Sequence, residues 1–218
     1  MRTHVSSQGK DHPAYTICQK PQPSLALAWR NSDEYEFLAH HIADVYQKIY
    51  GADIAVTYPL LMGFVDAEAK PLAALGIRYA VDESPLFLEC YLDQPAEVCL
   101  QAITGQYVSR QTIAEAGNMA SSGKGDILML LYGLACHLDC EGMSHILFTG
   151  TALLKRYLHS LGLYPHVLAE ADPARLGTDA SRWGSYYATH PKVMAGSVPA
   201  FRAGLECYFR NSAKRIWQ

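Results

Sequence analysis

The stretch GNMASSGKGD, residues 117 to 126, contains the glycines and the lysine that phosphate-binding loops use. A Walker-type loop needs four residues between its first glycine and the Gly-Lys pair, and then a serine or threonine that holds magnesium. Here five residues separate Gly117 from Gly123, and Gly125 follows Lys124. Because these differences change the register of the backbone amides and remove the hydroxyl ligand, the sequence argues against a nucleoside triphosphate site.

The same stretch nevertheless has the setting of an anion site. The run TIAEAGNMASSGKGDIL passes from a strand-like segment through a glycine-containing loop into an apolar, helix-like segment. The free amides at a helix N-terminus bind anions. The alternative is an ordinary glycine turn that packs the helix against the strand. The residues that would form an anion cradle are Gly117, Met119, Ser122, Gly123, Lys124 and Gly125.

Composition limits the class of protein. The chain has 218 residues, half of them hydrophobic, which suits one sizeable domain with a full core. A formal charge of −3 argues against a nucleic-acid binder, which normally carries a basic face. The N-terminus has no signal-like apolar run, and the longest apolar stretch, 127–136, is shorter than the roughly 20 residues of a spanning helix. We therefore expect a soluble, cytoplasmic enzyme or binding domain.

The six cysteines do not have the spacing of a disulfide framework. Cys136 and Cys140 lie one helical turn apart with His137 between them, but a metal site would need further ligands that the sequence does not offer. We therefore expect no metal and interpret the thiols as small hydrophobic core groups.

Apolar periodicity and turn residues divide the chain into alternating elements. The strongest prediction is a helix at 31–51, which Ser32 or Asp33 can cap and Gly51 can end. Its apolar stripe is expected to consist of Phe37, Leu38, His41, Ile42, Val45 and Ile49. The other expected elements are a strand at 24–29, a hairpin at 58–81, helices at 95–104, 125–142 and 151–163, and strands at 111–120, 144–150 and 164–172. The segment 85–94 is ambiguous, and 182–196 is expected to be irregular.

This order predicts an α/β fold with an antiparallel first half and parallel crossovers in the second. It suits a GNAT-like, three-layer αβα arrangement around a mixed, mostly antiparallel sheet, because a doubly wound nucleotide fold would not begin with a hairpin. We expect a mobile lead-in at 1–23, one acyltransferase-like domain at 24–199 and a basic amphipathic helix at 200–218. The apolar side chains of that helix would cover the domain or, alternatively, adsorb to a membrane surface; they are Phe201, Leu205, Tyr208 and Phe209.

Two segments resemble parts of GNAT-type acyltransferases. In those enzymes a loop in the place of residues 120–125 holds the pyrophosphate of coenzyme A, with the pattern Gln or Arg, two residues, Gly, any residue, then Gly or Ala. Gly123 and Gly125 match, but Ala120 stands where the basic or amide residue belongs, and Lys124 could supply that charge. The segment ALLKRYLHSLGL resembles the helix whose tyrosine protonates the departing thiolate. Tyr157 lies one residue before the expected position, so a role as a core or surface tyrosine is its alternative.

A closer resemblance covers roughly residues 25 to 198. GIRYA, PLFLECYLD, IAEAGNMAS, HILFTGTALLKRYLHSLGL and ADPARLG followed by RWGSYYATHPKVMAG occur in the order and at the spacing of the bacterial thermostable hemolysin family. WGSYY followed by Pro and AG is the most specific part. The sequence order of this family is also similar to that of acyl-homoserine-lactone synthases and other N-acyltransferases.

The resemblance implies transfer of an acyl group from acyl-CoA or an acyl carrier protein to a small amine. Such chemistry needs an oxyanion-stabilising amide near the donor carbonyl and a base for the amine. Amides around Asn118 and Met119 could serve the carbonyl. Glu115 could deprotonate or orient the amine, and a structural carboxylate paired with an arginine is its alternative.

Five further residues are candidates for substrate binding. Trp183, Tyr186 and Tyr187 form an aromatic cluster that could line an acyl or substrate pocket, with ordinary core packing as the alternative. His190 is the imidazole beside this cluster, and Glu89 is another acid that could face the cleft. The five are Glu89, Trp183, Tyr186, Tyr187 and His190.

The alternative function is a membrane-active cytolytic protein without acyl-transfer activity. It would require spanning helices or a closed barrel. Because no expected helix is long enough, membrane contact would be peripheral, and the sequence favours the acyltransferase.

Overall fold

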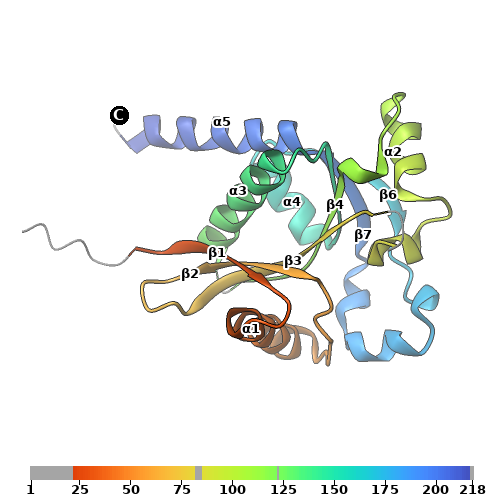
Figure 1. The fold of residues 1–218 in the computed structure, drawn as a ribbon, viewed down its shortest axis with the longest axis horizontal. Coiled ribbons are helices and arrows are strands. Elements are labelled where there is room, and N and C mark those ends of the chain that lie inside the picture. The colour runs from red at the N-terminus through yellow and green to blue at the C-terminus, as the bar shows by residue number, and fades with distance from the viewer. Residues whose placement is uncertain (1–21, 82–84, 122, 217–218) are drawn as a thin grey trace, which may run out of the picture.

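The computed structural model describes residues 22–81, 85–121 and 123–216, and it omits the side chains of Lys124 and of residues 213–216. Most of the expected lead-in at 1–23, together with Ser122, therefore lies outside the described residues. The chain forms one mixed sheet with helices on both faces (Figure 1).

The sheet of the described residues has seven strands in the order β1-β2-β3-β4-β5-β7-β6. All neighbouring strands pair antiparallel except β4 and β5, which pair parallel. The expected mixed, mostly antiparallel sheet is thus confirmed. The strands are β1 (Ser24–Trp29), β2 (Leu60–Val65), β3 (Pro71–Tyr79), β4 (Ile113–Ser121), β5 (His145–Gly150), β6 (His166–Glu170) and β7 (Lys192–Ser197).

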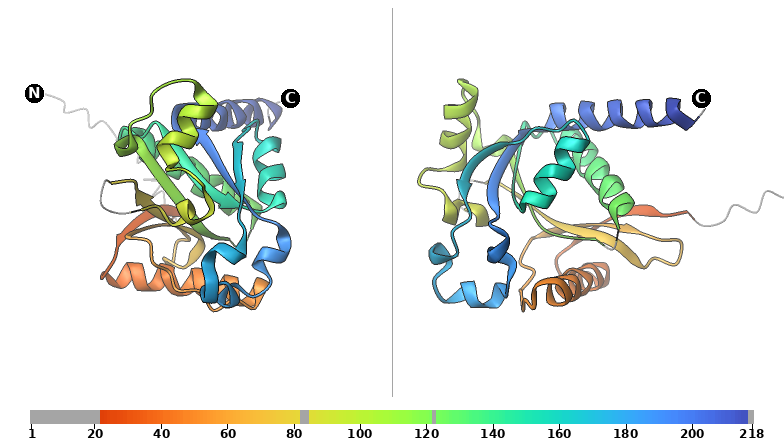
Figure 2. Two further views of the ribbon diagram at one scale, coloured as in Figure 1. Left: turned by 90° about the vertical axis from the view of Figure 1, so that its right-hand side faces the viewer. Right: turned by 180° about the vertical axis from the view of Figure 1, so that it is seen from behind.

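The helices cover the two faces of this sheet. On one face lie α1, α2 and the short 3₁₀ helices η1 and η4, while α3, α4 and α5 lie on the other (Figures 1 and 2). These helices give the three layers that the sequence predicted. They are α1 (Asp33–Tyr50), η1 (Phe87–Tyr91), α2 (Ala96–Thr104), η2 (Arg110–Thr112), α3 (Lys124–Cys140), α4 (Ala152–Ser160), η3 (Pro173–Trp183), η4 (Tyr186–Thr189) and α5 (Val198–Ile216).

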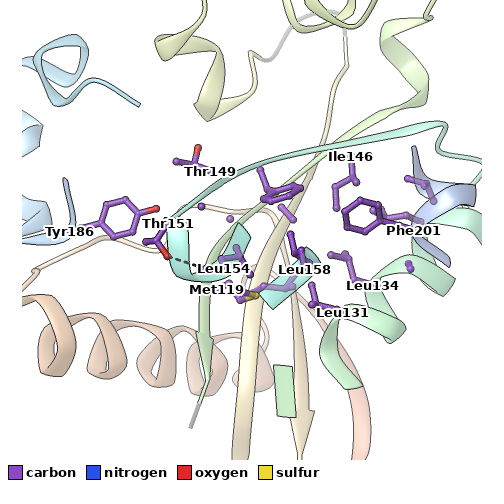
Figure 3. Close-up of a pocket in the computed structure, with 18 of the residues that line it drawn as sticks. Met119, Leu131, Leu134, Ile146, Thr149, Thr151, Leu154, Leu158, Tyr186 and Phe201 are labelled. Carbon is purple, nitrogen blue, oxygen red and sulfur yellow. Dashed lines mark hydrogen bonds between the residues drawn. The ribbon is translucent and has the colours of Figure 1, made fainter. Parts of the chain in front are cut away.

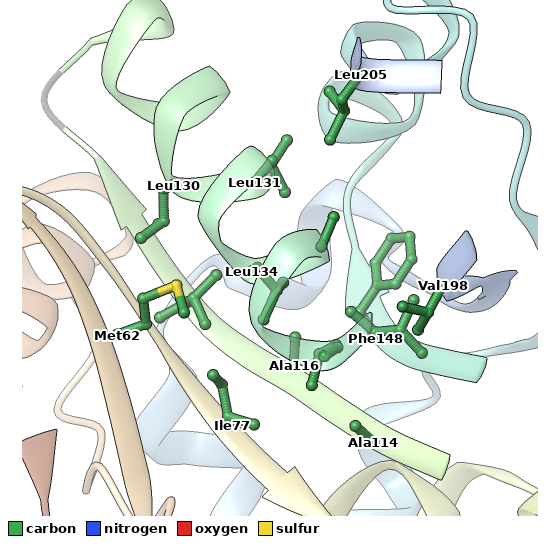
Figure 4. Close-up of a cluster of buried hydrophobic side chains, with 14 of the residues drawn as sticks. Met62, Ile77, Ala114, Ala116, Leu130, Leu131, Leu134, Phe148, Val198 and Leu205 are labelled. Atoms are coloured by element: carbon green, nitrogen blue, oxygen red, sulfur yellow. The ribbon is translucent and has the colours of Figure 1, made fainter. Parts of the chain in front are cut away.

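The main hydrophobic core lies between the sheet and the α3–α5 layer (Figure 4). α3 is apolar nearly all round because it packs against β2, β3 and β4 on one side and α5 on the other. In α5, Leu205 is fully buried and Phe209 packs on Tyr132 of α3, with ring centroids 5.2 Å apart. The apolar face of this helix therefore covers its own domain.

Helix α1 has the expected ends, but a different buried face. The Ser32 side chain accepts a hydrogen bond from the amide of Tyr35, and Gly51 ends the helix in a left-handed conformation. Leu38 and Ile42 are buried as expected, whereas Phe37 and Ile49 of the predicted stripe are exposed. The buried face instead contains Tyr35 and Tyr46, so the helix is rotated toward its aromatic residues.

The expected irregular segment 182–196 contains most of a strand, β7, that the sequence did not predict. β7 lies between β5 and β6, so its residues are buried from both faces and show no alternation of polar and apolar types. The prediction of several parallel crossovers was consequently wrong: β7 pairs antiparallel with both neighbours, and only β4–β5 is parallel.

The cysteines fill the core only in part: Cys90 and Cys99 pack against it with partly buried side chains. Among the described residues, Cys90, Cys99 and Cys136 are partly buried, while Cys140 and Cys207 are exposed. No group of three or more His, Cys, Asp or Glu side chains in the described part of the chain is arranged to hold a metal ion.

Candidate functional site

The strands β4 and β5 separate in the middle of the sheet. Their paired residues run from Ile113 and His145 to Ala116 and Phe148. Beyond these, β4 continues to Ser121 and β5 to Gly150, and no further β4–β5 pair occurs among the described residues. The backbone of β4 after Ala116 is therefore not bonded to β5, and an opening forms between the two strands.

A bulge in β4 lies at this opening. Gly76 of β3 pairs with Gly117 and Ala74 pairs with Ala120, so Leu75 is opposite two residues of β4, Asn118 and Met119. Asn118 has a φ of 51°. Asparagine is one of the few non-glycine residues that adopt this left-handed conformation readily. The bulge re-aims the side chains that follow it.

A cavity of about 110 Å³ extends from the opening into the main core. Tyr186, Thr149 and Thr151 lie at one end of it, and leucines, Ile146 and Phe201 lie toward the other (Figure 3). The apolar part of its wall comes from β4, α3, β5, α4 and α5; examples are Met119, Leu131, Leu134, Leu138, Phe148, Leu154, Leu158 and Val198. Several of these side chains also belong to the core of Figure 4. The larger cavity is thus a hydrocarbon-lined space with a polar mouth.

A second, smaller cavity of about 20 Å³ adjoins the first. The two share four wall residues, Tyr46, Gly117, Thr149 and Tyr186. They therefore meet at the opening between β4 and β5. The other wall residues of the smaller cavity are Asn118 and five aromatic residues, Tyr58, Phe87, Tyr91, Trp183 and Tyr187.

Two glycines make room for Tyr58. A Cβ atom at Gly76 would lie 2.2 Å from Cγ of Tyr58, and one at Gly117 would lie 1.9 Å from its hydroxyl oxygen. Gly76 and Gly117 face each other across β3 and β4, so together they form a slot in which the ring lies. The hydroxyl of Tyr58 then reaches Oε1 of Glu115, to which it donates a hydrogen bond of 2.9 Å.

Glu115 is only 2% exposed and accepts two further hydrogen bonds. The amide of Phe87 donates to its Oε2 at 2.8 Å, and the amide of Leu88 donates to its Oε1 at 3.2 Å. Burial raises the pKa of Glu115, while the hydrogen bond from Tyr58, the amide of Phe87 and the charge of Arg78 lower it. Because burial is the largest effect, this carboxylate is a stronger base than an exposed glutamate.

Arg78 lies beside this group without forming a direct ion pair with it. It is opposite Glu115 in the β3–β4 register, and its Cζ lies 5.4 Å from the centroid of the Tyr58 ring. Its guanidinium donates to the carbonyls of Pro85 and Thr57, both at 3.3 Å. The alternative interpretation makes Glu115 a structural carboxylate paired with an arginine. Arg78 fits it only in part, because Arg78 acts on Glu115 through its charge at a distance and not through a direct ion pair.

The structure brings six of the predicted site residues together. Trp183, Tyr186 and Tyr187 lie in the wall of the smaller cavity with Asn118, Met119 lies in the wall of the larger one, and Gly117 belongs to both. Their roles in binding or catalysis remain predictions. The wall of the smaller cavity also contains four residues that the sequence did not indicate: Tyr46, Tyr58, Tyr91 and Thr149.

Four other predicted residues lie outside the walls of both cavities: Glu115, which bonds to the wall residue Tyr58, and Glu89, Tyr157 and His190. Glu89 binds Arg110 through both carboxylate oxygens, at 2.6 and 2.8 Å, and accepts the amides of Leu86 and Ala96. Tyr157 packs against the main core. His190 is exposed and ends η4 in a left-handed conformation. Tyr157 differs from its wall-lining neighbour Leu158 by one helical position, which turns its side chain by about 100°.

The predicted anion cradle lies at the start of α3. The helix begins at Lys124, and its N-cap, Gly123, forms no side-chain capping bond. The Ser121 hydroxyl donates to the carbonyl of Gly123, and the amide of Gly123 donates to the same hydroxyl oxygen. Asp126 lies in the first turn and adds a negative charge there. Ser122 and the Lys124 side chain, which the prediction also used, lie outside the described structure.

Comparison with known families decides the identity. The family model for thermostable hemolysin matches residues 29–201. The chain belongs to the thermostable hemolysin family. A search of curated proteins found no match to this member of the thermostable hemolysin family.

Solved structures show the same fold at low sequence identity. FeeM, an N-acyl amino acid synthase from uncultured soil microbes, is 12% identical, with a TM-score of 0.56 over 84% of this chain and 94% of its own. The AHL synthase LasI is 12% identical, with a TM-score of 0.55 over 82% and 91%.

The CoA-dependent acyl-homoserine lactone synthase BjaI, solved with SAM and isopentyl-CoA, is 11% identical, with a TM-score of 0.53 over 82% and 80%. These likenesses confirm the GNAT-like fold for this member of the thermostable hemolysin family. Within the described residues, none of its helices is both long and apolar enough to cross a bilayer.

Proposed function

We propose that this protein transfers an acyl group from a thioester, either acyl-CoA or an acylated carrier protein, to a small amine. The observation that carries the proposal is the pair of adjoining cavities at the opening between β4 and β5. One cavity is lined by hydrocarbon and the other by aromatic rings, and Gly117 and Thr149 belong to both. An acyl chain and an amine bound in the two cavities would meet at these residues.

The larger cavity suits the acyl chain of the donor. Its wall away from the mouth consists of leucine, isoleucine, valine, methionine and phenylalanine side chains (Figure 3). Transfer of a methylene group from water into such surroundings contributes about 0.8 kcal/mol. A donor with a medium or long chain would therefore bind more tightly than an acetyl donor.

The backbone of β4 would serve the donor carbonyl. After Ala116 this strand no longer pairs with β5, and the bulge at Asn118 changes the direction of its amides. Backbone amides that point at a developing oxyanion are among the largest contributors to acyl-transfer catalysis. We assign this role to the amides around Asn118 and Met119, and contact with the donor phosphates to the start of α3, including Lys124.

Calorimetric titration with decanoyl-CoA, decanoyl-carrier protein and free coenzyme A tests the donor site. Leu134→Phe would fill part of the cavity and displace about one methylene group, which corresponds to roughly fourfold weaker binding of the decanoyl donor. Leu134→Met is the matched control, because it nearly conserves volume. Binding of coenzyme A itself should not change in either variant.

Two outcomes would contradict the donor proposal. One is that neither decanoyl thioester binds to the wild-type protein. The other is that Leu134→Phe binds decanoyl and acetyl donors as the wild type does, because the chain would then not occupy the larger cavity. Lys124→Ala should weaken coenzyme A and decanoyl-CoA equally, since its proposed contact is with the phosphates.

A further inference from the structure

The smaller cavity has an unusual wall. Seven of its ten wall residues are aromatic, and none of the ten carries a charge. Trp183 is central to this wall: its ring centroid lies 6.0 Å from that of Phe87, 5.4 Å from that of Tyr186 and 5.8 Å from that of Tyr187. Aromatic rings that surround a small space attract cations through their quadrupoles.

The size of the cavity limits what it can hold. A volume of about 20 Å³ slightly exceeds the roughly 10–15 Å³ that one water molecule needs. A primary ammonium group has about the size of a water molecule, whereas each added methyl group would require the rings to move apart. The cavity therefore suits a primary ammonium group and excludes a trimethylated one.

Three hydroxyl groups of the wall have hydrogen-bond partners on the protein, those of Tyr58, Tyr91 and Tyr187. The hydroxyls of Tyr91 and Tyr187 bond to each other at 2.5 Å, and that of Tyr58 donates to Glu115. Tyr58 is therefore the wall residue that joins the cavity to a buried carboxylate. Arg78 lies close to the same ring and offsets part of the charge of Glu115. Selectivity for a cation must then come mainly from the rings.

We infer that the smaller cavity binds the primary ammonium group of the acyl acceptor, and that Tyr58 relays a proton from this group to Glu115. The inference rests on the proposed function and specifies its acceptor. Tyr58 touches the ammonium group and is a catalytic residue, whereas Glu115 acts through Tyr58. The position of the cavity at Gly117 and Thr149 places the nitrogen beside the donor carbonyl.

The proton balance of this reaction closes without a further reactant. The ammonium group gives one proton to the Tyr58 oxygen as the phenol gives its own to Oε1 of ionised Glu115. The neutral nitrogen then attacks the thioester carbon, a C–N bond forms and the C–S bond breaks. The second nitrogen-bound proton goes to the departing thiolate. The products are an amide, a thiol and a protonated Glu115, which returns its proton to solvent.

Steady-state release of thiol from decanoyl-CoA, or from decanoyl-carrier protein, tests the inference with three acceptors. Hexylamine should accelerate thiol release, while hexanol should not. Trimethylhexylammonium should neither accelerate thiol release nor compete with hexylamine, because it does not fit. Trp183→Leu should raise the KM for hexylamine about tenfold and leave the KM of the donor unchanged.

The proton relay through Tyr58 and the binding of the ammonium group by the aromatic wall predict different kinetic changes. Tyr58→Phe keeps the ring and removes the hydroxyl, so kcat should fall about 100-fold while the KM for hexylamine changes less than twofold. Tyr79→Phe is the control: the Tyr79 hydroxyl bonds to His137 at 2.8 Å and lies outside both cavity walls, so its loss should not change kcat.

The outcomes separate this inference from the proposed function. If decanoyl thioesters bind but hexylamine does not accelerate thiol release, or hexanol accelerates it equally, the acceptor assignment is wrong and the donor site stands. Competition by trimethylhexylammonium, or an unchanged KM for hexylamine in Trp183→Leu, would also overturn the claim that the aromatic wall binds the ammonium group. A kcat for Tyr58→Phe equal to that of the wild type would overturn the relay. If no decanoyl thioester binds, the proposed function itself fails.

Discussion

Removal of the Tyr58 hydroxyl should destabilise the fold by an amount that increases with pH. In the wild type this hydroxyl donates to buried Glu115 at 2.9 Å, and the bond lowers the pKa of that carboxyl against the opposing effect of burial. A hydrogen bond to a charged group contributes about 1.5–3 kcal/mol, and one between neutral groups about 1 kcal/mol. Tyr58→Phe should therefore cost about 2 kcal/mol when Glu115 is ionised and about 1 kcal/mol when it is protonated.

The direction of the pH dependence follows from proton linkage. The pKa of Glu115 is raised in the folded state, so between the unfolded value, about 4.3, and the folded value the native protein binds more protons than the unfolded chain. Its contribution to stability is thus fully present below the unfolded pKa and is lost as pH rises through the folded pKa. Tyr58→Phe raises the folded pKa further, so the additional loss extends over a wider range of pH.

Urea denaturation of the wild type and Tyr58→Phe across this range measures the difference directly. At its upper end, a loss of about 2 kcal/mol corresponds to a melting temperature roughly 4–8 °C lower for a chain of this size. Tyr35→Phe is the matched control, because the equally buried Tyr35 hydroxyl donates to the neutral carbonyl of Tyr58 at 2.6 Å. Its cost should be about 1 kcal/mol at every pH. A Tyr58→Phe cost that does not change with pH would refute the assignment of Tyr58 as the partner of an ionising Glu115.

Two further substitutions test the geometry of the opening by urea denaturation. Gly76→Ala should lower the free energy of unfolding by about 1–3 kcal/mol, because its Cβ would lie 2.2 Å from Tyr58. Gly125→Ala has nothing within 4 Å of its Cβ, so it should be neutral or stabilise α3 by up to about 1 kcal/mol. Equal effects of the two substitutions would contradict the slot that Gly76 and Gly117 form for the Tyr58 ring. Asn118→Gly should leave the free energy of unfolding nearly unchanged, while Asn118→Val should lower it by about 1–2 kcal/mol, because valine adopts a positive φ poorly. An Asn118→Val variant as stable as the wild type would show that the bulge is not strained.

The sequence predicted the strand, loop and helix that carry much of the site, because these elements are contiguous in the chain. The run from Ile113 into α3 has a strand, glycines and a helix in one continuous segment, so its order could be read directly. The sequence did not predict β7, because a strand buried from both faces lacks the alternation of polar and apolar residues.

Tyr58 escaped for a different reason. Its position depends on Gly76, Gly117 and Glu115, which are distant in sequence and are brought together only by the register of β3 and β4. A single-residue bulge decides that register, and no local pattern specified it. The pair Tyr46 and Tyr50, one helical turn apart, is the sign in the sequence that α1 presents an aromatic face.

The fold also constrains how this family could act on membranes. Direct lysis would require an apolar surface, and α5 offers one only if it leaves the domain. Its Leu205 is fully buried, and Phe201 lines the larger cavity, so release of the helix would open the main core. An amide made from a long acyl chain and a polar amine is, by contrast, amphiphilic in itself. The intact protein alone should therefore release no dye from protein-free liposomes, and release should require an acyl donor and an amine together. Dye release by protein alone, at a temperature where α5 remains packed, would show that lysis does not depend on acyl transfer.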